Sequence, residues 1–389
     1  MRIFFKEIII ELINTFEENN FKCFIVGGAV RDLMLGITPK EFDFSTDANP
    51  TEIKNIFKKH IDIGEKNGCI KIFFKGEWFE ITTFRKEYDY VDFRHPSSVE
   101  FVKSPFEDCI RRDFKINSMY LNLSEFIDPL NGLKDLENKI IYSNGNANLK
   151  FKEDPLRILR GIYLKSKLNF KFHFLTLLGM IKNRNLISKI TKFRIHDELK
   201  KIFSNEFSIE GIKILNSLKI FQIIFKSPIK ILNLNNLIKS SSFHFKVFCI
   251  LYFHSDFQKE EIINSITENF NFNKKQLNEL KWLIDSINHF ENNSYFIKFC
   301  ISKYNYDFSK NILEVIDFYI KQGTLNKFYE IKWGYSPIKI SHLKIQTFKF
   351  SKNKERIESL NNYLLTLIHK YPNLNEKNKL IHLCKTFKF

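Results

Sequence analysis

The glycines of this 389-residue chain are concentrated near its start, and their distribution divides the chain into two parts. Eight of the 13 glycines lie within the first 145 residues, among short β-type runs and turns. Beyond Gly145, long segments of Leu, Ile, Lys, Asn and Phe have helical spacing. Because glycine favours tight turns and disfavours helix interiors, this distribution predicts a sheet-containing first part followed by helices.

Local patterns predict the elements of the first part. Residues 21–26 are expected to form a buried strand that stops at Gly27-Gly28, and residues 29–35 a short helix closed by Gly36. A second short strand is expected over residues 42–45. Asn49-Pro50-Thr51-Glu52 has the pattern of a capping box with proline at the first helical position, which predicts a helix to about Lys59.

Further along, residues 69–74 and 78–84 flank a Lys75-Gly76 turn and predict a β-hairpin. The polar and aromatic run over residues 85–96 is expected to be a loop. From Asp154-Pro155 onward the pattern predicts one helix after another, without a fixed-period repeat.

The net charge of the chain indicates which class of molecule it binds. The chain has 61 Lys and Arg against 44 Asp and Glu, so its formal charge of +17 favours a polyanion, either nucleic acid or an anionic membrane surface. AT-rich coding DNA is a compositional alternative, since it also produces many Lys, Asn, Ile and Phe codons. No stretch approaches about 18 uncharged apolar residues, and the six cysteines match no zinc or redox spacing, so a cytoplasmic protein without a membrane span is expected.

Three clusters carry chemistry, and each has a plain structural alternative. Gly27-Gly28 after a strand permits close approach of a phosphate, and Glu41 and Asp43, two apart on a predicted strand, share a face as Mg²⁺ ligands would. The alternative is an ordinary turn beside a solvated strand edge.

The second cluster, Arg111-Arg112, has the charge and geometry to clamp a triphosphate, or else forms a surface ion pair with Glu107 or Asp108. The third cluster contains Asp154 and Arg157, three apart at a helix start. Its structural alternative is an Asp154 N-cap with Pro155 at the first helical position and Arg157 as the salt-bridge partner of Asp154.

Taken in order, these clusters resemble the class II tRNA nucleotidyltransferase/poly(A) polymerase family, which includes the CCA-adding enzymes of bacteria and eukaryotes. The similarity runs from about Phe21 to Leu199. Six segments carry it: residues 26–46 (VGGAVRDLMLGITPKEFDFST), 79–96 (FEITTFRKEYDYVDFRHP), 111–119 (RRDFKINSM), 127–141 (IDPLNGLKDLENKII), 153–160 (EDPLRILR) and 193–203 (FRIHDELKKIF).

The resemblance implies roles for individual residues. It implies that Glu41 and Asp43 hold two catalytic Mg²⁺ ions, with Glu80 as a third carboxylate. It also implies that Asp154 and Arg157 read the incoming base, supported by Arg160, and that Arg194 and Glu198 stabilise the helices below. The nucleotide-binding residues so implied are Gly27, Gly28, Arg31, Arg111, Arg112, Asp154, Arg157 and Arg160.

Base reading by one Asp–Arg pair has a physical basis. Cytosine and adenine each present an amino donor beside a ring-nitrogen acceptor, which a carboxylate and a guanidinium satisfy together. Uracil and guanine would place a carbonyl oxygen against the carboxylate, leaving polar groups unpaired at about 1–3 kcal/mol each. The pair therefore accepts CTP and ATP without a template.

The architecture implied is α+β: a nucleotidyltransferase head with a small mixed sheet (residues 1–145), then an all-helical neck (146–230) and a helical body and tail that bind tRNA (231–389). The function implied is addition of CMP and AMP from CTP and ATP to the tRNA 3′ end; no oligomeric state is predicted. The alternatives are a poly(A) polymerase or A-only adding enzyme of the same family and, from another class, a catalytically inactive RNA-binding protein.

The chain departs from the family pattern at two positions. Glu41 stands where the family has aspartate, which adds a methylene to a metal ligand that tolerates little geometric error. Tyr163 stands where many members carry another arginine, and Lys165 is the nearby basic residue considered as its replacement. His196-Asp197 has the form of a metal-dependent HD phosphohydrolase dipeptide, but it is expected to be an exposed helical pair.

Overall fold

The structure is a computed structural model that describes residues 6–90, 92–227, 229, 242–255 and 257–288, with residues 360, 363, 364, 367, 371, 374 and 377–386 near the C-terminus. The chain divides into two compact units, residues 1–230 with 269–271 and residues 231–268 with 272–389. Most of the expected tail falls outside the described residues.

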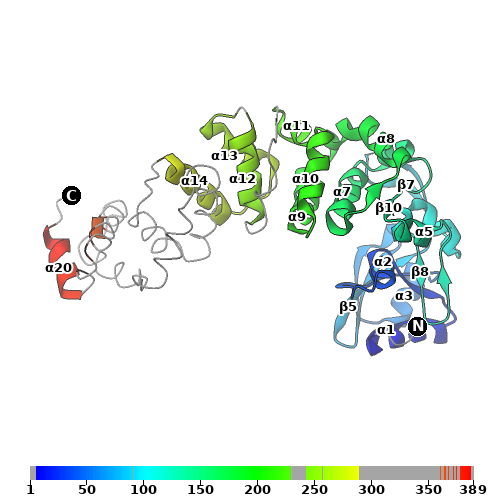
Figure 1. Cartoon of the computed structure of the whole chain (residues 1–389). Coiled ribbons are helices and arrows are strands. Elements are labelled where there is room, and N and C mark those ends of the chain that lie inside the picture. The colour runs from blue at the N-terminus through cyan, green and yellow to red at the C-terminus, as the bar shows by residue number, and fades with distance from the viewer. Residues whose placement is uncertain are drawn as a thin grey trace. The chain divides into compact units, whose positions relative to one another are not determined.

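The first unit contains a seven-stranded sheet in the order β3-β4-β5-β2-β1-β8-β9 (Figure 1). Strand β1 is antiparallel to β2 and β8, whereas β2 is parallel to β5, so the sheet is mixed as expected. The strands are β1 (Cys23–Val26), β2 (Asp43–Thr46), β3 (His60–Gly64), β4 (Cys69–Phe74), β5 (Glu77–Thr83), β8 (Tyr120–Leu121) and β9 (Phe126–Ile127).

Aromatic packing stabilises this sheet, and one of the aromatic residues also contacts a buried carboxylate. Phe24, Phe84 and Tyr120 are fully buried, with ring centroids 6.0–6.2 Å apart. Burying each such side chain contributes about 1.5–3 kcal/mol. The Tyr120 hydroxyl donates to Asp108 at 2.7 Å, which links the core to buried charges described below.

Short helices accompany the strands, and their caps follow the sequence. Asn49 accepts from the backbone N–H of Glu52 at 3.0 Å while the Glu52 carboxylate accepts from that of Asn49 at 2.7 Å, so the capping box is confirmed. These helices are α1 (Glu7–Glu18), α2 (Gly28–Met34), α3 (Pro50–Ile56), η2 (Glu65–Asn67), α4 (Pro105–Asp108), η3 (Cys109–Arg111), η4 (Lys115–Asn117) and α5 (Gly132–Glu137).

Strands β4 and β5 confirm the expected hairpin, but the loop expected over residues 85–96 is wrong. Strands β6 (Arg85–Tyr90) and β7 (Pro96–Phe101) pair antiparallel as a separate two-stranded sheet. The run is polar because its charged side chains pair with one another and with a more distant residue: the Glu87 carboxylate contacts Arg85 on the same strand and Arg111 further along the chain. Charge pairing here replaces the apolar alternation that usually identifies a strand.

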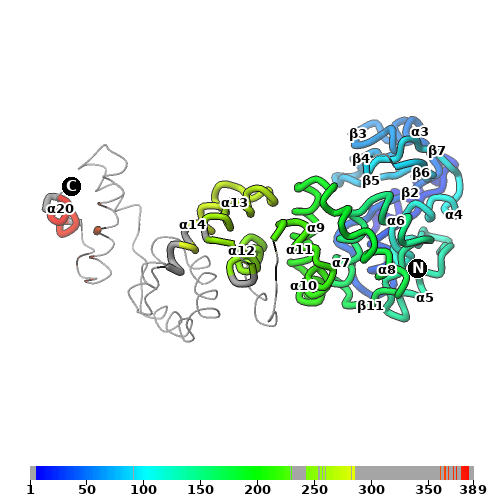
Figure 2. Tube along the Cα trace, turned by 90° about the horizontal axis from the view of Figure 1, so that it is seen from above, coloured from blue at the N-terminus to red at the C-terminus, as the bar shows by residue number. Residues whose placement is uncertain are grey.

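Helices dominate the rest of the first unit. Helix α7 packs against α9 and α10, and Gly211 on α10 allows close contact, since a Cβ there would lie 2.8 Å from Ile202 on α9 and 2.9 Å from Ser166 on α7. Figure 2 shows α7, α9, α10 and α11 as neighbouring segments. The helices are α6 (Ala147–Glu153), α7 (Leu156–Leu168), α8 (Phe174–Asn183), η5 (Arg184–Lys189), α9 (Lys192–Ser204), α10 (Ser208–Ser217) and α11 (Ile220–Phe225).

One strand interrupts this helical part, so "all-helical" is not strictly correct. β11 (Lys171–Phe172) pairs in parallel with β10 (Ile140–Ile141). His196 corrects a second expectation: it is 9% exposed on α9 rather than an exposed residue. The described helices of the second unit are α12 (Phe243–His254), α13 (Lys259–Asn269), α14 (Lys274–Asn288) and α20 (Lys377–Thr386). Among the described residues, no helix has the length and apolar character to cross a membrane.

Candidate active site

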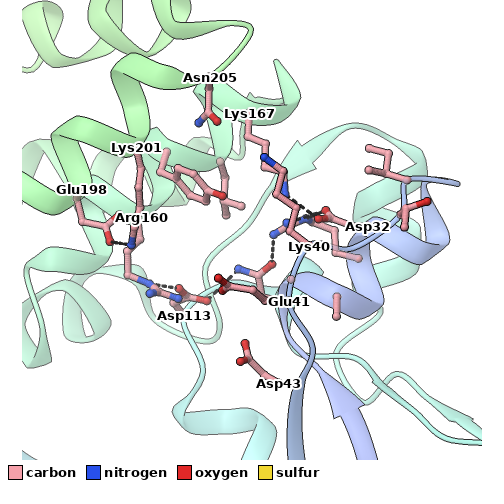
Figure 3. A pocket seen from close by; sticks show the side chains of 18 residues that line it. Asp32, Lys40, Glu41, Asp43, Asp113, Arg160, Lys167, Glu198, Lys201 and Asn205 are labelled. Carbon is pink, nitrogen blue, oxygen red and sulfur yellow. Dashed lines mark hydrogen bonds and ion pairs between the residues drawn. The ribbon is translucent and has the colours of Figure 1, made fainter. Parts of the chain in front are cut away.

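Two adjoining cavities, of about 440 and 570 Å³, lie in the first unit and share Gly28, Asp43, Asp113, Asn117 and Arg160 as lining residues. We call the smaller the lysine arm, because Lys40, Lys167 and Lys201 line it (Figure 3). We call the larger the arginine arm; its lining includes Arg85, Arg94, Arg111, Arg112, Arg157 and Arg194. The shared residues make the two arms one cleft.

The Gly27-Gly28 pair forms part of the cleft wall where strand β1 ends and helix α2 begins. Gly27 has φ +68°, a left-handed conformation that glycine adopts without strain. A Cβ at Gly28 would lie 3.3 Å from Nη2 of Arg31. The lack of side chains therefore keeps backbone and guanidinium close together at this wall, and the phosphate-binding role expected for this turn stays a prediction.

Arg31 lies in this wall but is almost sealed, with 3% exposure. Its Nε and Nη2 donate to Asp32 Oδ1 at 3.0 and 2.7 Å, and Nη1 donates to Asn117 Oδ1 at 2.7 Å. Lys167 donates to the other Asp32 oxygen at 2.7 Å. The structure thus places Arg31 at the lysine arm with protein partners on its guanidinium.

The three carboxylates predicted for catalysis occupy different positions on or beside β2 and β5, two neighbouring strands in the interior of the sheet. Asp43 begins β2, in register with Val26 on β1 and Glu80 on β5, so Asp43 and Glu80 are neighbours on parallel strands. Glu41 precedes β2 rather than lying in it, which corrects the expected strand position, yet it lines the lysine arm with Asp43. Glu80 is half-exposed and pairs with Lys71 at 3.9 Å.

The electrostatics at Asp43 are those of crowded carboxylates. Burial raises the pKa of Asp43, and Glu80 and Glu41 raise it further, while Arg112 and Arg160 act in the opposite direction. A bound cation would relieve this repulsion, and oxygen donors suit Mg²⁺, which needs only one or two carboxylates when phosphates and water complete its shell. Within the described part of the chain no group of three His, Cys, Asp or Glu side chains has metal-binding proximity. Asp43 and Glu41 line the same cavity and have the carboxylate oxygens that such an ion takes as ligands, so their role as metal ligands stays a prediction.

Arg111 and Arg112 converge on one buried carboxylate. Arg111 Nε lies 2.7 Å from Asp108 Oδ1, and Arg112 Nη2 lies 2.9 Å from Asp108 Oδ2 and from the Ser45 hydroxyl. Burial opposes ionisation of Asp108, but the two guanidinium groups hold its pKa well below the ordinary range. The ion-pair alternative was right about Asp108 as a partner but wrong about a surface location, because Asp108 is 0% exposed.

Asp154 and Arg157 both line the arginine arm, but each has a different partner from the one expected. Arg157 Nη1 lies 2.7 Å from Glu153 Oε2, and its Nη2 donates to the Tyr90 hydroxyl at 3.3 Å. Asp154 accepts from Leu156 N–H at 3.1 Å and from Arg194 at 3.0 Å. The Asp154–Arg157 salt bridge of the structural alternative is therefore wrong. Asp154 does accept from a backbone N–H at the start of α7, but α7 begins at Leu156 with Pro155 at the N-cap, so the placement of Asp154 as N-cap and Pro155 as first helical residue is also wrong.

Arg160 lies where the two arms meet. Its Nε donates to Asp113 Oδ2 at 2.6 Å, and Asn117 links the other Asp113 oxygen, at 3.3 Å, to Arg31. Burial disfavours the charged form of Asp113, but Arg160 lowers its pKa below the ordinary value. A continuous chain of bonds thus runs from Arg160 through the head to Asp32.

Sequence reasoning missed several members of this site. Asp113 and Asn117 lie inside a recognised segment, so their contacts could have been suspected from it. Glu87 and Tyr90 lie in the run over residues 85–96 that the sequence predicts to be a loop, so the sequence does not indicate their contacts. Lys167 lies outside every segment that carries the resemblance. Its helical spacing of seven residues from Arg160 was the available signal.

Comparisons with known proteins agree with this arrangement. Residues 23–142 match the poly A polymerase head domain family, and residues 169–230 match a family described as the probable RNA and SrmB-binding site of polymerase A. A CCA-adding enzyme of Bacillus pumilus is 36% identical over 214 residues, covering 55% of this chain and 54% of that protein. One from Pediococcus pentosaceus is 43% identical over 187 residues, covering 48% and 47%.

Solved structures extend the similarity in fold. The Bacillus stearothermophilus CCA-adding enzyme in complex with CTP has a TM-score of 0.73 at 20% identity, covering 97% of this chain and 96% of that one. The Thermotoga maritima CCA-adding enzyme complexed with tRNA has a TM-score of 0.65 at 18% identity, covering 98% and 95%. In sequence, the chain spans about half the length of the curated relatives it matches.

Proposed function

Because residues 23–142 of this chain belong to the poly A polymerase head domain family and residues 169–230 to the polymerase A RNA-binding family, we propose that the protein adds CMP and AMP, from CTP and ATP, to the 3′ end of tRNA without a template. One observation carries the proposal. Asp43 lies at the junction of the two arms, between the arginine arm with Asp154 and Arg157 and the lysine arm with its ammonium groups.

Base selection falls to the arginine arm. The Asp154 carboxylate accepts the amino group of cytosine or adenine, and the Arg157 guanidinium donates to the neighbouring ring nitrogen. Glu153 and the Tyr90 hydroxyl hold Arg157 in place, and Arg194 holds Asp154. Uracil and guanine are refused because their carbonyl oxygens would face the Asp154 carboxylate with no donor, at a cost of about 1–3 kcal/mol.

The transfer step occurs at the junction. The RNA 3′-OH attacks the α-phosphorus, a new P–O bond forms, the bond to the β-phosphate oxygen breaks, and pyrophosphate leaves. Arg160 and the Gly28 backbone face the phosphates there, and Arg31, Arg111 and Arg112 lie in the surrounding walls. Glu41 and Asp43 would hold two Mg²⁺ ions, with Glu80 beside Asp43. Such ions supply activation of the attacking hydroxyl and neutralisation of the leaving group.

The proposed function divides the chain into a catalytic part and an RNA-binding part. We assign residues 1–145 to the catalytic head, 146–230 to the neck, and 231–389 to a body and tail that hold tRNA through its phosphates. The net charge of +17 supports electrostatic binding by shape rather than by base sequence. A cytoplasmic location follows from this substrate.

Two other functions fit fewer observations. A poly(A) polymerase or A-only enzyme would share the head, whereas the Asp154–Arg157 pair in the arginine arm fits cytosine as well as adenine. A catalytically inactive RNA-binding protein is suggested only by Glu41, and Asp43 keeps its place in the cleft beside it.

One assay tests the proposal. Transcripts of tRNA ending at the discriminator base, at C and at CC are offered labelled CTP and ATP, separately and together. We expect CMP addition to the first two, AMP addition to the third, and no extension beyond CCA. Extension by many AMP residues would identify a poly(A) polymerase, and no incorporation with retained tRNA binding would identify the inactive protein.

A further inference from the structure

One face of helix α7 runs along the whole cleft. Arg157 lines the arginine arm, Arg160 lines both arms, and Tyr163 and Lys167 line the lysine arm. Spacings of three and four residues place these side chains on one face. The ten residues from Arg157 to Lys167 correspond to about 15 Å along the helix axis. That length is comparable with the reach of a nucleoside triphosphate from its base edge to its last phosphate.

Lys167 is the cation at the far end of this face. Its ammonium lies 2.7 Å from Asp32 Oδ2, in the lysine arm (Figure 3). Arg31 holds the opposite oxygen of Asp32 with two donors, and the Arg31 side chain is 3% exposed whereas that of Lys167 is 27% exposed. If Lys167 moves to another anion, Asp32 stays neutralised by Arg31, so the exchange leaves no buried charge unpaired.

We propose that Lys167 binds the terminal phosphate of the incoming nucleoside triphosphate, leaving Asp32 when the substrate enters. The inference rests on the proposed function and names a substrate contact outside the segments that carry the family resemblance. The base at Arg157 and the α-phosphate at Arg160 direct the triphosphate along α7 toward Lys167, and the flexible four-carbon stem of lysine allows the change of partner.

Other basic groups support this assignment. Lys40 and Lys201 line the same arm, and Lys201 is held by Glu198 at 2.8 Å. Tyr163 lies between Arg160 and Lys167 on this face of α7 and carries no positive charge, so the next cation after Arg160 on the face is Lys167. Lys165, considered earlier as the replacement, instead bonds to Asn169 Oδ1 at 2.9 Å, beyond the end of the helix.

The test compares nucleotides that differ only in their phosphates. Binding of CTP, CDP and CMP is measured by titration calorimetry with Mg²⁺ and without RNA, so that no transfer takes place. We expect Lys167→Gln to weaken CTP binding about tenfold, the size of a lost charge-assisted hydrogen bond, with CDP and CMP binding unchanged. Lys167→Arg should restore CTP binding, and Lys165→Gln, two residues away on the same helix, should match the wild type.

Each other outcome overturns the inference in a distinguishable way. Equal weakening of all three nucleotides with a lower Tm would make Lys167 a support for the Asp32–Arg31 pair. Unchanged CTP binding in a well-folded Lys167→Gln protein would remove the contact, and a loss of tRNA affinity alone would assign the arm to an RNA phosphate. Failure of the proposed function would look different, because the wild-type protein itself would then bind ATP but not CTP, as a poly(A) polymerase would, or would bind neither nucleotide.

Discussion

The guanidinium of Arg157 is paired with Glu153, four residues earlier, and not with Asp154: Nη1 of Arg157 and Oε2 of Glu153 are 2.7 Å apart. Asp154 is instead paired with Arg194 on α9, at 3.0 Å. The two groups proposed to read the base are thus anchored independently, and one can be altered without releasing the other.

Asp154→Asn tests base reading. Asparagine keeps the oxygen that accepts from Leu156 N–H, so Tm should change little. Its amide can also present a donor to a carbonyl, so UTP or GTP should be incorporated at rates approaching those of CTP and ATP. The measurement is a four-nucleotide single-addition assay on tRNA ending in C, beside a thermal melt.

Arg194→Gln is the matched control, because it removes the same ion pair and leaves the Asp154 carboxylate in place. It should change Tm as little as Asp154→Asn does and still reject UTP and GTP, because the Asp154 carboxylate remains; addition of CTP and ATP should be slower, because Arg194 no longer holds that carboxylate. Unchanged selectivity in Asp154→Asn would reduce this residue to a helix cap.

Asp43→Asn tests the catalytic centre. Incorporation should fall to background while tRNA affinity is retained, because Asp43 belongs to the proposed metal site. Since burial and the neighbouring carboxylates raise the pKa of Asp43, its charged form is disfavoured in the fold. Neutralising it should therefore leave Tm unchanged or higher in metal-free buffer. Asp62→Asn, on the exposed strand β3, is the control expected to keep full activity. Substantial activity of Asp43→Asn would remove Asp43 from the mechanism.

The same raised pKa predicts a pH effect on catalysis. Asp43 must be ionised to hold a cation, so nucleotide addition should decline as pH falls through a range above 3.8, the ordinary aspartate value. The Mg²⁺ concentration needed for half-maximal rate, measured from pH 8 down to the lowest pH at which the protein stays folded, should rise as pH falls. A constant Mg²⁺ requirement across this range would contradict the assignment.

Asp108→Asn tests the buried charge cluster. Removing this carboxylate leaves Arg111 and Arg112 without their shared counter-charge, which should destabilise the protein by about 3 kcal/mol. Because the folded pKa of Asp108 is depressed, its contribution is complete above about pH 3.8 and is lost as pH falls further. The gap in stability between wild type and variant should therefore be constant from pH 8 to 5 and narrow only in stronger acid.

Glu107→Gln is the control, since Glu107 forms an exposed ion pair with Lys86 and should be replaceable without a change in Tm. If Asp108→Asn were as stable as this control, the cluster would not stabilise the head.

Salt dependence tests the binding of RNA. Log K for tRNA should fall with log salt by about 0.7–0.9 per phosphate contact. Filter binding at several KCl concentrations measures the slope of log K against log salt. A tRNA mutated outside its 3′ end is the control and should give the same slope. A flat response would make the charge of +17 a compositional effect.

Local signals in the sequence were sufficient to predict much of the secondary structure of the head. The capping box at Asn49 and Glu52, and the Lys75-Gly76 turn, act over a few residues, so the elements they define could be predicted. The β6–β7 hairpin could not, because its Glu87 is stabilised by Arg111, far along the chain. The sequence predicts the wrong salt-bridge partner for Arg157. Its partner in the structure, Glu153, is the last residue of α6, and Asp154-Pro155 separates it from α7, so spacing within α7 does not indicate this pair.

The small β10–β11 pairing has a mechanical consequence. Ile140 and Ile141 lie opposite Lys171 and Phe172, and Tyr142 stacks on His173 at 3.7 Å. This strap lies just past the C-terminal end of α7, and Arg160 ties the same helix to Asp113. A hinge motion between the head and α7 would have to break the strap and this ion pair at once. For the function proposed here, the change between CTP and ATP is therefore expected to be accommodated by side-chain rotation, while the backbone of this part stays in place.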